Sequence, residues 1–144
     1  HEPNFQLVII NSNIEHSTQS MVSKVKEFEK RNKEEFSRLS NLESKVIEDV
    51  LKLIKENKMQ EIGQKMNQNQ EYLENIGISN NELTSMIKIG QELSFGAKIT
   101  GSGGGGCIFA LTNESNLQTI LKKFKDNNYE CFSAKIDFKG LNTF

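Results

Sequence analysis

Residues 97–111 read Ala-Lys-Ile-Thr-Gly-Ser-Gly-Gly-Gly-Gly-Cys-Ile-Phe-Ala-Leu, and this stretch decides the fold. Apolar and polar residues alternate before the glycines and a β-prone apolar run follows them, so the pattern predicts two strands joined by a glycine loop. Glycine reaches positive φ angles, at which successive backbone N–H groups can turn toward one point. Because Ser102 carries the only side chain among residues 101–106, we expect a loop whose bare amides bind an anion.

Glycine-rich runs more often form flexible linkers, and that alternative has to be weighed here. A linker is rarely bounded at both ends by strand sequence without a polar spacer, which favours a structured turn. The loop also differs from two common phosphate-binding motifs. A P-loop needs a Lys-Ser or Lys-Thr pair where Cys107-Ile108 stand, and a dinucleotide-binding fold needs a helix where a strand follows.

Length and composition set the broad class of the protein. The 144 residues are enough for one sizeable core, and we expect one domain. Eighteen Lys and Arg against nineteen Asp and Glu leave a formal charge of −1, which argues against nucleic acid or a membrane surface as a partner. Cys107 and Cys131 match neither a metal-binding spacing nor a disulfide framework, so we expect a reduced, cytoplasmic protein. The absence of an initial methionine and the strand within the first residues indicate a piece of a longer polypeptide.

The periodicity of the apolar residues predicts four strands and five helices. Outside the glycine hairpin these are strands at 5–10 and 130–138 and helices at 17–28, 36–56, 59–76, 80–93 and 113–124. The charged run at 29–35 is expected to join the first two helices. Gly77 is placed to end the third helix, and Ser79 with Glu82 to form a capping box for the fourth. This order predicts an α+β domain with an antiparallel sheet and helices on one face.

Three kinds of polar residue are candidates for a role beside the glycine loop. Asn69 interrupts the apolar stripe of its helix, and a buried amide without a partner costs about 1–3 kcal/mol. It therefore either faces a solvated groove or braces the glycine loop. Strand alternation favours Lys98 as a solvated edge lysine over a phosphate ligand. The aspartates are far from the loop in sequence and are expected to be surface charges: Asp49, Asp126 and Asp137.

Residues 98–107 resemble the third, C-terminal motif of the kinase superfamily that includes galactokinase, homoserine kinase, mevalonate kinase and phosphomevalonate kinase. The likeness is greatest to the mevalonate kinases. It continues upstream without gaps, because Asn69-Gln70, Leu73 and Ile76-Gly77-Ile78 resemble the segment Asn-Gln-x-x-Leu-x-x-Leu-Gly-Val of that family.

This resemblance implies a four-stranded, ferredoxin-like antiparallel sheet with helices on one face and an extra helical layer. Residues 1–144 would be the C-terminal domain of a small-molecule kinase. The implied activity is ATP-dependent phosphorylation of mevalonate to phosphomevalonate, in the biosynthesis of isoprenoid and sterol precursors. The implied cofactors are ATP and Mg²⁺, both held mainly by an N-terminal domain, so that this chain alone would be inactive. The implied partners are mevalonate, that N-terminal domain and, in a homodimer, a second copy.

The resemblance also implies where the site lies. The residues that would face the phosphate and substrate cleft are Gly101, Ser102, Gly103, Gly104 and Gly105. Ser102 stands where the family usually has alanine, close to mevalonate. Thr18 matches a family threonine whose hydroxyl can reach the substrate, although the same residue could simply cap its helix. Relatives carry basic residues around that threonine, where this chain has Glu15, His16 and Gln19.

No catalytic or metal-binding residue is expected in this chain. Two alternatives stay open at this point. The first is a non-catalytic module that uses the glycine hairpin to bind an anion or a partner. The second is a kinase of the same superfamily that acts on another small alcohol or on a phosphorylated mevalonate.

Overall fold

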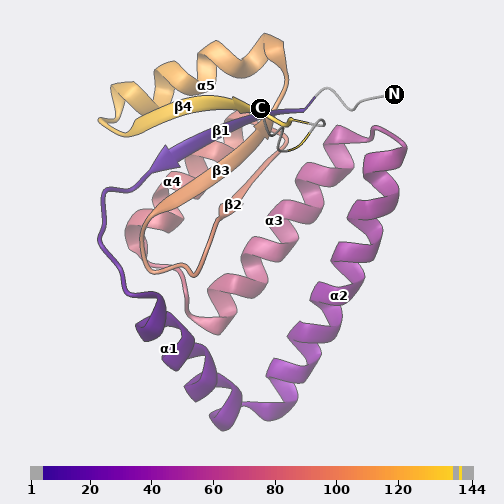
Figure 1. Cartoon of the computed structure of the whole chain (residues 1–144), viewed down its shortest axis with the longest axis vertical. Helices are drawn as coiled ribbons and strands as arrows, with labels where there is room; N and C mark the ends of the chain where they lie inside the picture. The colour runs from indigo at the N-terminus through magenta and orange to yellow at the C-terminus, as the bar shows by residue number, and fades with distance from the viewer. Residues whose placement is uncertain (1–4, 138–139, 141–144) are drawn as a thin grey trace.

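The computed structural model describes residues 5–137 and residue 140, and in these residues the strands form one antiparallel sheet in the order β2-β3-β1-β4 (Figure 1). The strands are β1 (Gln6–Asn11), β2 (Gly96–Ile99), β3 (Cys107–Thr112) and β4 (Glu130–Lys135). The helices are α1 (Thr18–Arg31), α2 (Lys33–Lys55), α3 (Met59–Ile76), α4 (Asn81–Leu93) and α5 (Glu114–Asp126). The predicted α+β fold class is confirmed.

One face of the sheet is covered by α4 and α5, which lie behind it and above it in Figure 1. Alternate residues of β1 and β3 point into this core, with Val8 opposite Ala110 and Ile10 opposite Ile108. The helices contribute Leu83, Met86, Ile87, Ile120 and Phe124, all at most 1% exposed. Burying such side chains supplies most of the stabilisation of a core of this kind, at roughly 25 cal/mol per Å².

The other face of the sheet is covered only in part. Helix α3 runs along β2 and packs against α2, and together these helices form the predicted extra layer (Figure 1). A second cluster joins this layer to the sheet through Phe5, Ile62, Met66 and Leu111. Toward β4 the same face is open, and Phe132 is 61% exposed there.

Two predictions about the helix ends were wrong. The join between α1 and α2 is the single residue Asn32, because the charged residues on either side continue the helices. The predicted capping box is also absent. Asn80, in an extended conformation, caps α4 by accepting a hydrogen bond from the Leu83 N–H at 2.9 Å, while the Ser79 hydroxyl lies 3.1 Å from that of Thr84. Glu82 instead accepts a hydrogen bond from Tyr129.

The last strand is shorter than predicted. Strand β4 ends at Lys135, which is opposite Gln6, the first residue of β1. Beyond that position β1 offers no further partner, so the ladder stops. Phe138, the predicted end of the strand, lies outside the described residues. None of the helices in the described ranges combines the length and apolar character that crossing a membrane requires.

Tyr129 ties the end of α5 to the start of α4. Its hydroxyl donates to the Glu82 carboxylate, and its ring packs edge-on against Phe124 with the ring centroids 6.0 Å apart. The hydrogen bond to Glu82, and next to it burial, raises the pKa of Tyr129 from 10.0 to about 12. Since the folded-state pKa is the higher one, this stabilisation is complete below about pH 10 and is lost as the pH rises through about 12.

We therefore expect Tyr129→Phe to lower the free energy of unfolding by about 1 kcal/mol near neutral pH, because the partly buried hydrogen bond is lost while the ring packing is kept. Urea denaturation of the full-length protein measures this difference. The gap between the native protein and the variant should narrow as the pH is raised from 10.0 toward about 12. Equal stability of the two proteins near neutral pH would contradict the expected contribution.

Candidate functional site

The glycine loop between β2 and β3 is a folded turn and not a linker. Gly101, Gly103, Gly104 and Gly106 have φ angles of +74°, +78°, +78° and +70°, which only glycine adopts without strain. The loop also packs closely against neighbouring backbone. A Cβ atom added at Gly103 would lie 2.4 Å from the carbonyl oxygen of Ile78.

Hydrogen bonds fasten the loop on both sides. The Gly104 N–H donates to the Ile78 carbonyl at 2.8 Å, and the Asn80 side-chain amide donates to the Gly104 carbonyl at 3.0 Å. On the other side, the Gly106 N–H donates to the Ile14 carbonyl at 3.1 Å. The cap of α4 and the segment after β1 therefore hold the loop in one conformation.

Four backbone amides of the loop are left over. Among the described residues, the N–H groups of Gly101, Ser102, Gly103 and Gly105 have no hydrogen-bond partner. Backbone amides are strong donors, and an unpaired group is costly wherever water is excluded. This fixed turn with four unpaired amides is therefore the candidate site for an anionic ligand.

Two hydroxyl groups from distant parts of the chain meet beside this turn. The Ser102 hydroxyl donates to Oγ1 of Thr18 at 3.5 Å, across 84 residues of sequence. Thr18 does not cap its helix, because Ser17 holds the N-cap position and accepts a hydrogen bond from the Ser20 N–H at 3.2 Å. The Thr18 hydroxyl is thus not engaged in helix capping and lies at the edge of the glycine loop.

The residues after β1 and the first turns of α1 form one wall of the loop. A Cβ atom at Gly104 would lie 2.6 Å from Sδ of Met21, and one at Gly106 would lie 2.9 Å from Cε1 of His16. His16 is therefore a packing neighbour of the loop as well as an exposed side chain. Thr18 and Ser102 are site candidates from the sequence, and the structure brings them together. Asn80, which fastens the loop, was not among those candidates, although its Asn-Asn-Glu context is a helix-start signal that could have revealed it.

Asn69 does not brace the glycine loop, nor is it solvated. It is 7% exposed, and its amide donates to the Glu43 carboxylate on α2. The interaction satisfies the amide, which explains why a polar residue is tolerated in the apolar stripe. The side chains of α3 that reach the strand before the loop are its neighbours Asn67 and Gln70, which accept hydrogen bonds from β2.

Lys98 is not the solvated edge lysine that was predicted. Its ammonium group lies 5.5 Å from the ring centroid of Phe109 and donates to the Ile99 carbonyl at 3.1 Å. Burial lowers the pKa of Lys98, and the nearby Glu43 carboxylate acts in the opposite direction. The lysine thus contributes a cation–π contact on the sheet rather than a charge at the glycine loop.

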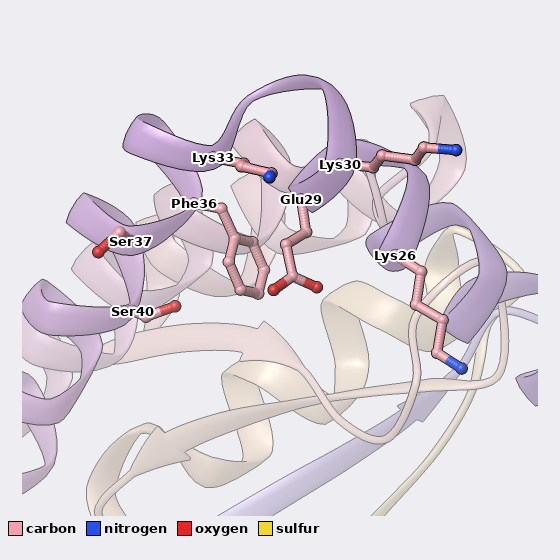
Figure 2. Close-up of a pocket in the computed structure, with 7 residues that line it drawn as sticks. All are labelled: Lys26, Glu29, Lys30, Lys33, Phe36, Ser37 and Ser40. Atoms are coloured by element: carbon pink, nitrogen blue, oxygen red, sulfur yellow. The ribbon is translucent and has the colours of Figure 1, made fainter.

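A separate hollow lies between α1 and α2 and has a volume of about 590 Å³. Figure 2 shows the Glu29 carboxylate beside the Phe36 ring, whereas Lys26 and Lys30 extend away from it. The remaining lining residues are Lys33, Ser37 and Ser40. Because its lysines do not converge, this hollow is not an anion site like the one predicted at the glycine loop.

The charged groups of the described residues do not form a metal centre. Within the ranges that the structure covers, no three His, Cys, Asp or Glu side chains come close enough together to hold a metal ion. Asp49 instead forms an ion pair with Lys65 at 2.8 Å, and Asp126 pairs with Lys122. The donors of the candidate site are therefore amides and hydroxyls, a set that suits an anion and not a cation.

The profile of the family described as GHMP kinases C terminal matches residues 50–130, more than half of the chain. The chain belongs to this family. The match includes α3, α4, the glycine hairpin and α5, and so it covers the elements that position the glycine loop in this GHMP kinase chain.

The individual relatives of this GHMP kinase chain described next are each named mevalonate kinase. It is 36% identical over 76 residues to "Mevalonate kinase" of Methanocaldococcus jannaschii, which covers 53% of this chain and 24% of the relative. It is 33% identical over 114 residues to "Mevalonate kinase" of Thermococcus sibiricus, with coverage of 74% and 34%. The crystal structure of the Methanococcus jannaschii mevalonate kinase matches with a TM-score of 0.81 at 28% identity, over 94% of this chain and 41% of that one. The chain thus spans well under half the length of these relatives.

Proposed function

We propose that this chain is the C-terminal domain of an ATP-dependent mevalonate kinase, which phosphorylates mevalonate to phosphomevalonate. The observation that carries the proposal is the fixed turn with four unpaired amides, flanked by the Thr18 and Ser102 hydroxyls, in a chain of the GHMP family. The likeness to relatives named mevalonate kinase supports the choice of acceptor.

The chain's own part in the reaction would be to position anionic and hydroxyl groups. Phosphoryl transfer depends mainly on placing the donor and acceptor and on stabilising negative charge. Ile78, Asn80 and Ile14 hold the backbone of the loop in place. The unpaired amides of the loop would therefore donate to phosphate oxygens at little reorganisation cost. Ser102 and Thr18 would contact the acceptor.

The remaining requirements would be met by an N-terminal domain of the full-length protein. ATP supplies the transferred phosphoryl group, and Mg²⁺ commonly neutralises its charge. Since the described residues offer no metal-binding cluster, we assign no step through Mg²⁺ to this chain. Both cysteines are free thiols, which suits a reducing cytoplasmic setting. The phosphomevalonate formed by the proposed reaction would enter the biosynthesis of isoprenoid precursors.

The direct test is a phosphorylation assay of the full-length protein with ATP and Mg²⁺. R-mevalonate is compared with phosphomevalonate, galactose and homoserine as acceptors. We expect kcat/KM to be highest for R-mevalonate. A preference for another of these acceptors would keep the kinase class but change the acceptor, and no turnover of any acceptor would leave only an anion-binding module.

Thr18 provides a residue-level test of the same proposal. Thr18→Val keeps the shape of the side chain and removes the hydroxyl beside Ser102, so we expect kcat/KM for mevalonate to fall about fivefold, the equivalent of one lost hydrogen bond of about 1 kcal/mol. Ser17→Ala is the matched control. It removes the helix cap and lowers the stability of α1 by about 1 kcal/mol, but it should leave kcat/KM unchanged. Equal losses in the two variants would mean that Thr18 acts only through the helix.

A further inference from the structure

Strand β2 lies at the edge of the sheet, and its outward-facing backbone groups are taken up by side chains instead of another strand. The N–H groups of Ala97 and Ile99 donate to Oδ1 of Asn67 at 3.0 Å and to Oε1 of Gln70 at 2.9 Å. Edge strands usually leave such groups to solvent. Here an α-helix takes the place of the missing neighbouring strand.

The close approach of α3 to β2 makes these hydrogen bonds possible. Gly63 and Gly96 touch backbone to backbone, since a Cβ atom at Gly96 would lie 2.1 Å from the Gly63 carbonyl oxygen. Asn67 and Gln70 follow Gly63 by four and seven residues, so the three share one face of the helix. We call residues 63, 67 and 70 the amide ladder of α3.

Gln70 is the end of the ladder nearest to the glycine loop. Its side chain is 1% exposed, and its amide nitrogen donates to the Glu74 carboxylate at 2.9 Å. That bond fixes which end of the amide faces the strand, so that Oε1 is presented to Ile99. Ile99 is the last residue of β2, two positions before Gly101, where the unpaired amides begin.

We propose that Gln70 is a positioning residue that holds the end of β2 and, through it, the unpaired amides of the glycine loop. The loop is fastened by Ile78 and Ile14 on its far side, and Gln70 provides the corresponding attachment where the chain enters it. The kinetic part of this proposal rests on the proposed kinase function. The structural part does not.

The test uses Gln70→Met in the full-length protein, because methionine has a similar length and its thioether sulfur is only a weak acceptor for the Ile99 hydrogen bond. Hydrogen exchange is followed by mass spectrometry over peptides that cover residues 96–106. If Gln70 holds the whole entry to the loop, about three additional amides should exchange, including those of Thr100 and Gly104, which are otherwise bonded to Cys107 and Ile78. One additional amide, that of Ile99, would show a purely local bond and overturn the proposal.

A matched variant separates positioning from general packing. Gln64→Met makes the same substitution on the exposed side of α3 and should change neither exchange nor kinetics. Gln70→Met is expected to lower kcat/KM about fivefold. A native kcat/KM in Gln70→Met, or an equal loss in Gln64→Met, would count against the proposal.

The outcomes distinguish this inference from the proposed function. If the native full-length protein phosphorylates none of the acceptors, the proposed function fails, while the exchange experiment still decides whether Gln70 positions the loop. Should Gln70→Met fail to fold, Asn67→Leu acts on the same ladder at a half-buried position. Faster exchange at Thr100 and Gly104 as well as at Ala97 in that variant supports the proposal, and faster exchange confined to Ala97 overturns it.

Discussion

If the full-length protein is the mevalonate kinase proposed above, replacing Gly103 by valine is expected to lower kcat/KM for mevalonate by at least about tenfold. Gly103 has a φ angle of +78°, and a β-branched residue held there is strained by about 1–3 kcal/mol. Its Cβ atom would in addition lie 2.4 Å from the Ile78 carbonyl oxygen and 2.9 Å from the Ile78 Cβ. The Ile78 backbone cannot move aside as a flexible side chain can. The loop must therefore shift, and its unpaired amides shift with it. Steady-state kinetics with ATP and mevalonate measures the loss.

Gly77→Ala is the matched control for this experiment. Gly77 has a φ angle of +86°, but nothing lies within 4 Å of an added Cβ atom. The variant therefore introduces a similar backbone strain at the end of α3 without a clash at the loop, and it should lower stability by about 1 kcal/mol with kcat/KM unchanged. Native kinetics in Gly103→Val would mean that the loop is a spacer and would remove the physical basis of the proposed site.

The largest effect on stability is expected from Gly63→Ala. Alanine is the better helix former by about 1 kcal/mol, so propensity alone predicts a gain. The added Cβ atom would, however, lie 2.0 Å from the Phe95 carbonyl oxygen, and the helix would have to leave the strand. The steric clash with the backbone destabilises the protein by more than the higher helix propensity of alanine stabilises it. We expect a net loss of about 3 kcal/mol in the free energy of unfolding.

Urea denaturation of the full-length protein, followed by a probe within this domain, measures that loss. Gln64→Ala serves as the control, because it lies one residue further along the same helix on its exposed side and should not destabilise the protein. A Gly63→Ala variant that is as stable as the native protein would show that α3 can move away from β2 without lowering the free energy of unfolding. The amide ladder would then have little energetic basis.

Sequence reasoning succeeded where the signal is local. The five glycines of residues 101–106 predicted the turn between two strands, and Gly77 predicted the end of α3, because positive φ angles leave few alternatives to glycine. Helical stripes and strand alternation predicted the remaining elements, since each depends on residues only a few positions apart.

It failed where the meaning of a polar residue depends on a distant partner. Asn67, Asn69 and Gln70 lie within four consecutive residues of one helix. Nothing in the sequence tells which of them hydrogen-bonds to β2 and which to α2. The cap of α4 was misassigned for a related reason, because Ser79 and Asn80 are both good cap residues. Asn80 is used in the structure, and its amide also reaches Gly104.

The amide ladder has a further consequence for association between chains. Because α3 occupies the outer side of β2, a strand from another polypeptide cannot add there, and in the described residues β4 is the remaining edge of the sheet. A molecule with one receptive edge can form a closed, two-fold symmetric pair by strand addition but cannot propagate into a fibre. Within the described part of this domain, α3 therefore leaves strand addition only the β4 edge, and addition through that edge pairs two copies of the domain.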